Sequence, residues 1–340
     1  MRARLWSDVQ VGEDLPELKF PITGKTLVMA AMGTRDLMPY HHDDEFVRSR
    51  GMRGAFVNTM FNQGLFGRFV TDWAGPTARF RSATLKMTNQ LVAGDEAVVN
   101  GTVTERWIVD NGDALVRLEL RTSNSLGTTA LSTTVLALPT TAGEHAAFRP
   151  LGEPEPAVLS DEMPQEARDQ VGVTSLRPGP YPVSEAQIGY FTEMVRDANP
   201  LYTDSAYATE SPAGGIVAPP PSLIVWVMDR GSQVGIDLDH PDVHLPQQPP
   251  WPVPAHKRAS LRLLPEMTDV IVQQVLLEFG LPLRPGDKVT AVNELVNCSA
   301  SRQTKLGPGH FLTARDTFVN QRDEPVGRST MTLLQYRAEG

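Results

Sequence analysis

The pattern of apolar and polar residues in the first half of the chain predicts one buried helix followed by four strands. Residues 55–70 contain no proline and are apolar around most of the helix circumference, which is typical of a helix buried on nearly all sides. The segments that follow alternate between apolar and polar residues, and turn residues such as Gly94-Asp95 and Gly127 separate them. The predicted strands cover residues 77–88, 96–109, 114–124 and 128–138.

The second half repeats this order of elements. Ser184 begins a capping-box pattern with apolar residues at helical spacing behind it, and this helix is expected to end near Asn199-Pro200. A further apolar helix is predicted over residues 222–228, directly after three consecutive prolines. The predicted strands cover residues 270–279, 288–299, 311–320 and 326–336. A buried helix with a meander of antiparallel strands, twice over, predicts an α+β double hotdog fold, in which each sheet wraps around a central helix.

Proline content divides the chain and marks an insertion. We expect an N-terminal hotdog at residues 1–138, a linker at 139–182 with eight prolines, and a C-terminal hotdog at 183–340. Residues 231–256 carry six further prolines and have no counterpart in the first half, which predicts a long inserted loop. We expect this loop to form a lid or wall over a bulky apolar group, with Trp251 or Leu245 facing that group.

Composition and charge exclude several classes of protein. The 340 residues carry 31 Lys and Arg against 40 Asp and Glu, a net charge of −9, without a dense basic cluster, so nucleic acid binding is not expected. The longest apolar run, residues 223–228, is too short to span a membrane, and the first residues lack an apolar signal segment. The single cysteine, Cys298, excludes an internal disulfide and a Cys-rich zinc module. These features favour a soluble, cytoplasmic protein.

One short motif occurs twice, at residues 35–43 and 196–204. Arg, Asp, Pro and a second Asp fall at matching positions in the two copies, which indicates a duplication. The copies differ where an acid/base residue matters most, because His41 of the first copy corresponds to Tyr202 of the second. One copy therefore has the residues for proton transfer, and the other has lost them.

Asp36 and His41 are the predicted catalytic pair. Pro39 lies between them and bends the chain, so that both side chains can converge. An imidazole can take a proton from water near neutral pH, and a carboxylate can orient that water or act as the matching acid. Addition of water to a carbon–carbon double bond needs both actions. A thioester carbonyl would also need hydrogen-bond donors, and the backbone N–H groups of Gly54 and Ala55, at the expected start of the buried helix, are the candidates.

The first motif resembles that of a known enzyme family. Asp36-x-x-Pro39-x-His41-x-Asp43 is similar to the motif of the MaoC-like, (R)-specific enoyl-CoA hydratases, and the second copy resembles it around Pro200 but lacks the histidine. The resemblance implies a double hotdog fold, an acyl-CoA substrate and stereospecific syn hydration. It also implies that no metal or cofactor takes part, with coenzyme A present only as part of the substrate.

Further segments resemble the two-subunit hydratases of actinobacterial cholesterol side-chain degradation, with both subunits fused here in one chain. The resemblance implies a bulky or steroid-like acyl group and a catalytic first half. The larger subunit of those enzymes carries a zinc-ribbon and OB-type domain that docks an aldolase, so we expect such a domain or the aldolase as a separate partner, beside a homodimer as a further candidate assembly. The segments that carry the resemblance are residues 34–36, 41–43, 56–58, 70–76, 199–202, 215–220 and 303–309.

Candidate substrate contacts lie around both motifs. Arg53 is a candidate for the phosphates of coenzyme A, although a solvated surface position explains it equally well. The full set of candidate substrate-binding residues is Arg53, Asn58, Asp197, Tyr202 and Trp251. A metal site is not expected, because the adjacent His42 and Asp43 point apart and no second cluster accompanies them.

Other functions remain as alternatives. The first is a dehydratase acting on acyl thioesters bound to a carrier protein, and the second is a non-catalytic acyl-thioester-binding partner. A hotdog thioesterase is disfavoured, because the carboxylate that it needs would lie on the buried helix, and residues 56–70 contain no Asp or Glu. The direction of the reaction, hydration or dehydration, stays open.

Overall fold

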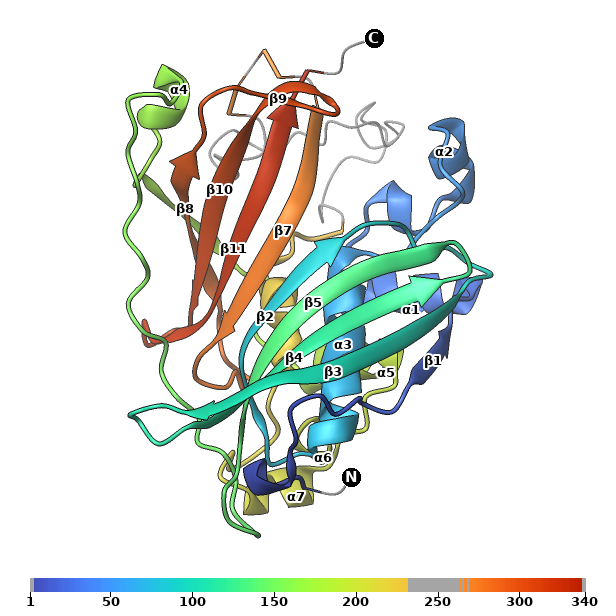
Figure 1. Cartoon of the computed structure of the whole chain (residues 1–340), viewed down its shortest axis with the longest axis vertical. Coiled ribbons are helices and arrows are strands. Elements are labelled where there is room, and N and C mark those ends of the chain that lie inside the picture. Colours follow the sequence, from blue (N-terminus) through green and yellow to red (C-terminus); the bar gives the residue numbers. More distant parts are fainter. Residues whose placement is uncertain (1–2, 232–262, 265, 268, 338–340) are drawn as a thin grey trace.

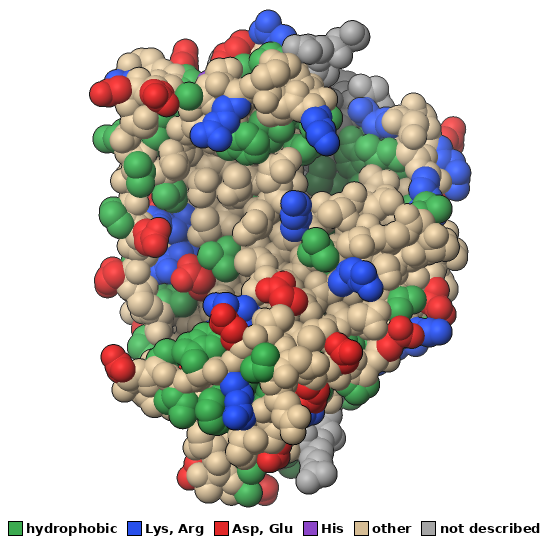
Figure 2. Space-filling model, in the orientation of Figure 1, with side chains coloured by type: hydrophobic (Ala, Val, Ile, Leu, Met, Phe, Trp, Pro, Cys, Tyr) green, Lys and Arg blue, Asp and Glu red, His purple; other side chains and the backbone are tan. Residues whose placement is uncertain are grey.

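The computed structural model describes residues 3–231, 263–264, 266–267 and 269–337 (Figure 1). The prediction for residues 231–256, including Trp251, therefore lies almost wholly outside the described residues. On the face in Figure 2, acidic and basic side chains are interspersed.

A long helix and five strands form the first half of the fold. Helix α3, Thr59–Ala74, lies against the concave side of the sheet, with Phe61 and Leu65 fully buried (Figure 1). Helix α1, Gly24–Thr34, packs near its start. Apolar residues on nearly all sides of α3 are therefore covered, as the sequence predicts. The strands are β1 Leu18–Pro21, β2 Arg79–Met87, β3 Glu96–Ile108, β4 Ala114–Asn124 and β5 Gly127–Leu138.

The second half repeats the arrangement with one difference. Helix α5, Glu185–Val195, corresponds to α1, but the central helix is η3, Pro220–Val227, a short 3₁₀ helix with fully buried Val225 and Val227. Proline cannot donate the backbone hydrogen bonds of an α-helix, and three of them occur at the start of this segment. The strands are β7 Asp269–Phe279, β8 Thr290–Cys298, β9 Arg302–Thr304, β10 Gly307–Val319 and β11 Pro325–Tyr336.

The two halves share one continuous antiparallel sheet. Among the described residues its strand order is β1-β3-β4-β5-β2-β7-β11-β10-β8-β6, with β9 beside β10. Strands β2 and β7 join the halves, with Leu85 opposite Val275, and Phe80 meets Phe279 edge to face at 5.7 Å. Their antiparallel pairing sets the two curved sheets side by side, each with its own central helix (Figure 1).

The predicted linker contains regular structure. A short helix, α4 Gln165–Arg168, is followed by strand β6, Thr174–Pro178, which pairs with β8 at the edge of the second half. The second half of the sheet therefore begins inside residues 139–182, and the expectation of a plain connection there was incomplete. Strand β6 is partly exposed along its length and ends in a proline, which cannot donate a backbone hydrogen bond. Both features are typical of an edge strand.

Candidate active site

The first motif is held by a sharp change of backbone direction. Helix α1 ends at Thr34, its C-cap Arg35 adopts the left-handed conformation with φ 58°, and Asp36 follows directly. Pro39 then begins the 3₁₀ turn η2, Pro39–His41, where its fixed φ is favourable. The two bends bring the side chains of Asp36 and His41 together, as the sequence predicts.

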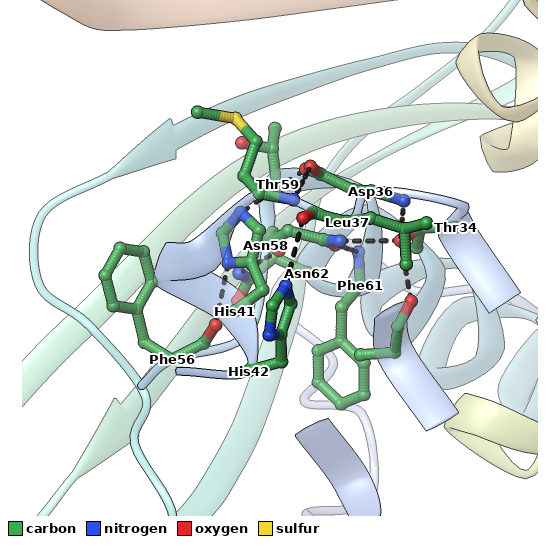
Figure 3. Close-up of polar contacts among 12 residues, drawn as sticks. Thr34, Asp36, Leu37, His41, His42, Phe56, Asn58, Thr59, Phe61 and Asn62 are labelled. Atoms are coloured by element: carbon green, nitrogen blue, oxygen red, sulfur yellow. Dashed lines mark hydrogen bonds and ion pairs between the residues drawn. The ribbon is translucent and has the colours of Figure 1, made fainter. Parts of the chain in front are cut away.

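Asp36 and His41 form a buried pair with a defined imidazole orientation (Figure 3). His41 Nδ1 lies 2.8 Å from the carbonyl oxygen of Phe56, and because a carbonyl only accepts hydrogen bonds, Nδ1 carries the proton. His41 Nε2 lies 3.3 Å from Asp36 Oδ2, and the two side chains are 10% and 13% exposed. The contact of Nδ1 with Phe56 therefore fixes the ring so that Nε2 faces the carboxylate of Asp36.

A chain of hydrogen bonds connects this pair to the start of helix α3 (Figure 3). Asn58 is the N-cap of α3, and its Oδ1 accepts the N–H of Phe61 at 2.8 Å. Its Nδ2 donates to Thr34 Oγ1 at 2.6 Å, and the same oxygen accepts the backbone N–H of Asp36 at 3.3 Å. Asn58 is only 2% exposed. It therefore fixes the motif to the helix rather than presenting a free amide.

A cavity of about 420 Å³ opens in front of His41. It is bounded by the loop before α3, the first turns of α3 and the segment after β2. The residues that line it are His41, Phe56, Val57, Asn58, Thr59, Asn62, Met87, Thr88, Asn89, Gln90 and Leu91. Asn62 donates through Nδ2 to the carbonyl oxygen of Asn58 at 2.9 Å, so its side chain lies one turn from the pair.

The prediction that Gly54 and Ala55 supply free N–H groups at the helix start was wrong. Helix α3 begins at Thr59, and the N–H of Ala55 donates to Asp44 Oδ1 at 2.9 Å. A β-carbon on Gly54 would lie 2.6 Å from the same Asp44 oxygen, so Gly54 makes room for this carboxylate. The first turn of α3, whose N–H groups have no partner within the helix, lines the cavity through Thr59 instead.

Arg53 is held in a turn on the first half. Its guanidinium binds Asp95 with two bonds, Nη2 to Oδ1 at 2.8 Å and Nη1 to Oδ2 at 3.3 Å. Asp95 also accepts from Asn124 and from the N–H of Val92. The Arg53 side chain is 39% exposed, so a phosphate can reach it, and its contact with coenzyme A stays a prediction.

The second motif keeps the backbone of the first without its histidine. Arg196 is left-handed at φ 58°, and Pro200 begins helix α6, Pro200–Thr203. Asp197 is 8% exposed and accepts the N–H of Asn199 at 2.9 Å. Burial raises the pKa of Asp197 to about 6. Its carboxyl group lines a groove of about 850 Å³ between the halves.

The last Asp of each motif is an N-cap, which explains its repetition. Asp43 Oδ1 accepts the N–H of Phe46 at 2.9 Å and begins helix α2, Asp44–Ser49. Asp204 Oδ1 accepts from Ala206 at 3.0 Å and begins helix α7, Ser205–Glu210. Since aspartate satisfies the orphan N–H groups of a helix start, these residues act structurally.

Sequence reasoning missed Thr59, Asn62 and the segment 87–91 as walls of the cavity. Asn62 was treated as part of an apolar helix. A polar side chain on a buried helix, one turn after Asn58, was a signal that this face of the helix lines a polar site. Met87 follows Asn62 by 25 residues, which is beyond the reach of helix or strand periodicity, so their convergence carried no local signal.

Two general features bear on cofactors and membranes. Within the described ranges, no three His, Cys, Asp or Glu side chains are grouped so that they could hold a metal ion. None of the described helices is both long and apolar enough to cross a membrane.

The fold is that of a hotdog protein, with Asp36 and His41 as its candidate acid/base pair, and comparison with known proteins agrees with the fold. Residues 169–275 match the family of the FAS1-like, dehydratase domain region. The chain is 34% identical over 128 residues to the 3-oxo-4,17-pregnadiene-20-carboxyl-CoA hydratase beta subunit of Mycobacterium tuberculosis, covering 38% of this chain and 95% of that subunit. The chain belongs to the MaoC-like hotdog family of hydratases and dehydratases.

Two further comparisons extend over more of the chain. A probable enoyl-CoA hydratase alpha subunit of Thermomonospora curvata is 29% identical over 163 residues, 47% of each protein, so the chain spans about half the length of that relative. A double-hotdog protein of Mycobacterium tuberculosis superimposes with a TM-score of 0.62 over 98% of this chain and 99% of that chain, at 13% identity. This similarity confirms the predicted double hotdog fold.

Proposed function

We propose that the chain adds water reversibly to the 2,3 double bond of an enoyl-CoA thioester, with Asp36 and His41 as the catalytic residues. The observation that carries the proposal is the position of His41 Nε2, 3.3 Å from Asp36 Oδ2, with Nδ1 held by Phe56 O. In the proposed division of labour, the half at 1–138 does the chemistry. The half at 183–340 lacks the histidine and helps to hold the acyl group.

The proposed reaction uses the pair on one face of the substrate. His41 Nε2 takes a proton from the attacking water while the oxygen bonds to C3, and electrons of the double bond move toward the thioester carbonyl. The imidazolium then returns this proton to C2, so that water is added without net proton loss. Delivery of both parts from the same side gives syn addition. Asp36 stabilises the imidazolium that exists between the two steps.

The thioester oxygen gains negative charge in this step and needs donors. We place the N–H groups of Thr59 and Met60 in this role, because they lie in the first turn of α3, and Thr59 lines the cavity. The positive end of the α3 dipole acts in the same direction. Asn58 holds this helix start in register with Asp36 through Thr34.

A bulky or steroid-like acyl group is the proposed substrate class. The support is the 34% identity with a subunit whose name specifies a pregnadiene carboxyl-CoA. Related proteins are named as alpha and beta subunits, so we propose that this chain combines both parts. It would then act on coenzyme A thioesters without a second hydratase chain. A homodimer, and a separate aldolase or zinc-ribbon and OB-domain partner, remain proposals.

The test is an assay of the purified chain alone on enoyl-CoA substrates from crotonyl-CoA to a steroidal enoyl-CoA. Hydration removes the conjugated thioester absorbance, and the chirality of the product reports the face of attack. A rate that rises with acyl size supports the proposal. Absence of turnover with every substrate, by protein with native circular dichroism, would contradict it.

A second candidate function is dehydration of 3-hydroxyacyl groups on a carrier protein. The match of residues 169–275 to a FAS1-like dehydratase region favours it. The same acyl group offered on coenzyme A and on an acyl carrier protein separates the candidates, since the preferred carrier is the one with the larger kcat/KM.

A further inference from the structure

The second half contains a small cavity at the position that corresponds to the cavity of the catalytic pair. Tyr202, Ala218 and Leu283 line it, and they correspond to His41, Val57 and Leu91 in the first half. Its volume is about 50 Å³. Its remaining walls are mostly apolar and include Phe80, Leu201, Val217, Leu223, Phe279 and Val326. The duplication has therefore left a second, smaller pocket without a histidine.

Two arginines of the first half line this pocket, and one of them, Arg81, is paired with Asp113 at 2.8 Å. Arg79, on strand β2, is only 5% exposed. Its Nη1 donates to the carbonyl oxygens of Pro76 at 2.8 Å and Ala78 at 2.6 Å, and its Nη2 lies 3.1 Å from His145 Nδ1. The guanidinium lies over the ring of Phe148 at 4.4 Å. In the described part of the structure Arg79 Nε has no hydrogen-bond partner.

Every partner that the described residues give Arg79 is uncharged. Besides burial, the groups that shift the pKa of Arg79 are Tyr202, Tyr207 and a second cation, Arg81. Burial lowers the pKa of Arg79 to about 10, so it remains a cation at neutral pH. A buried charge without a counter-ion is costly. Arg328, equally buried at 5% exposure, shows the usual solution, because its Nη1 binds Glu278 Oε2 at 3.1 Å.

We propose that this pocket binds a short aliphatic carboxylate, with Arg79 as its counter-ion. The carboxylate satisfies the open donor on Arg79, and Tyr202 lies beside the same space as a second polar group. The apolar walls take the alkyl chain. A volume of about 50 Å³ holds roughly four water molecules, which suits an acid of three or four carbons. The site is separate from the Asp36 and His41 cavity, and it does not depend on the proposed reaction.

Butyrate is the probe, and butyramide is its neutral control of the same shape. Binding is measured by isothermal titration and by the shift in Tm, with sodium chloride added to equal ionic strength. We expect butyrate to bind with a Kd in the millimolar range and butyramide to bind at least tenfold more weakly, since a charge-assisted hydrogen bond is lost. Equal binding of the two compounds overturns the proposal. Absence of butyrate binding at about 50 mM also overturns it, because a weak small ligand with a Kd of about 1 mM would saturate the site at that concentration.

Two variants test the role of the pocket itself. Arg79→Gln should weaken butyrate binding at least tenfold, while Arg328→Gln, which removes an equally buried arginine outside the pocket, should leave it unchanged. Val217→Phe fills the pocket and keeps Arg79, so it should abolish binding even if Arg79→Gln does not fold. Butyrate binding that survives Val217→Phe with unchanged Kd places the ligand elsewhere and overturns the assignment.

Discussion

Arg35 and Arg196 occupy equivalent positions in the two halves and make equivalent contacts across them. Both have φ 58°, which is uncommon for residues with a side chain. The guanidinium of Arg35 lies 4.7 Å from the ring of Tyr181, and that of Arg196 lies 4.9 Å from the ring of Phe20. Each arginine thus contacts the aromatic residue that precedes the equivalent helix of the other half, Tyr181 before α5 and Phe20 before α1.

These reciprocal contacts explain why the second motif persists without its histidine. They place cation–aromatic pairs between the halves, and such pairs contribute about 0.5–1 kcal/mol each at exposed sites. The backbone conformation that aims Arg196 at Phe20 also places Asp197 in the groove between the halves. The motif therefore serves packing in both halves. In the proposed function it also serves acid/base chemistry, but only in the first half.

The first prediction concerns the proposed division between the two motifs. Replacement of His41 or Asp36 by Ala should lower kcat by about 100-fold or more, as expected when a positioned acid or base is lost. Asp197→Ala should change kcat little and act on stability or KM, because its half has Tyr202 in place of histidine. Steady-state kinetics with one enoyl-CoA measures all three variants, and equal kcat losses at Asp36 and Asp197 would refute the assignment.

The order of the central helix and the four long strands in each half could be predicted because each of these elements has a local signal. Alternation gave the strands after residue 77, and Gly94-Asp95 and Gly127 gave their turns. The start of helix α3 was misplaced because apolar residues already begin at Ala55, whereas the true N-cap, Asn58, carries a cap signal that the apolar pattern obscured.

Long-range contacts of the sites could not be predicted from local pattern. Asp36 and His41 are near in sequence, and Pro39 between them made their convergence predictable. Arg79 gave no signal, since its place in the pocket of the second half depends on the pairing of β2 with β7. The bond from Ala55 to Asp44 likewise depends on a fold-back that periodicity does not encode.

The second prediction concerns Asn58 as a structural connection. Asn58→Ala removes the N-cap of α3 and the donor to Thr34, and should lower the free energy of unfolding by about 2 kcal/mol. Asn58→Ser keeps a good N-cap and should recover part of this loss. Urea denaturation followed by circular dichroism measures the difference. Equal losses in the two variants would show that capping is not the cause.

The third prediction is that activity needs no metal ion. The proposed reaction consists of the addition of the water oxygen to C3 and of proton transfers by His41, while Asp36 and backbone N–H groups stabilise the charges that develop. Hydratase rates should therefore be unchanged after dialysis against EDTA, and unchanged again when zinc or magnesium is added. Loss of activity with EDTA and recovery with zinc would contradict this prediction.

The last prediction uses the pH dependence of stability at Asp197. Its pKa is raised to about 6 from 3.8 because burial disfavours the charged carboxylate. The folded state therefore binds more protons than the unfolded state between these values, and stability falls as pH rises from about 4 to above 6. Asp197→Asn keeps the acceptor for the Asn199 N–H and removes the charge. The variant should be more stable than the original chain at pH 7.5, by at most about 3 kcal/mol, and equally stable near pH 4. Urea denaturation at both pH values measures the two differences, with Asp204→Asn, an exposed cap in the same motif, as the control for a general charge effect. A difference that is the same at both pH values would mean that folding does not raise the pKa of Asp197.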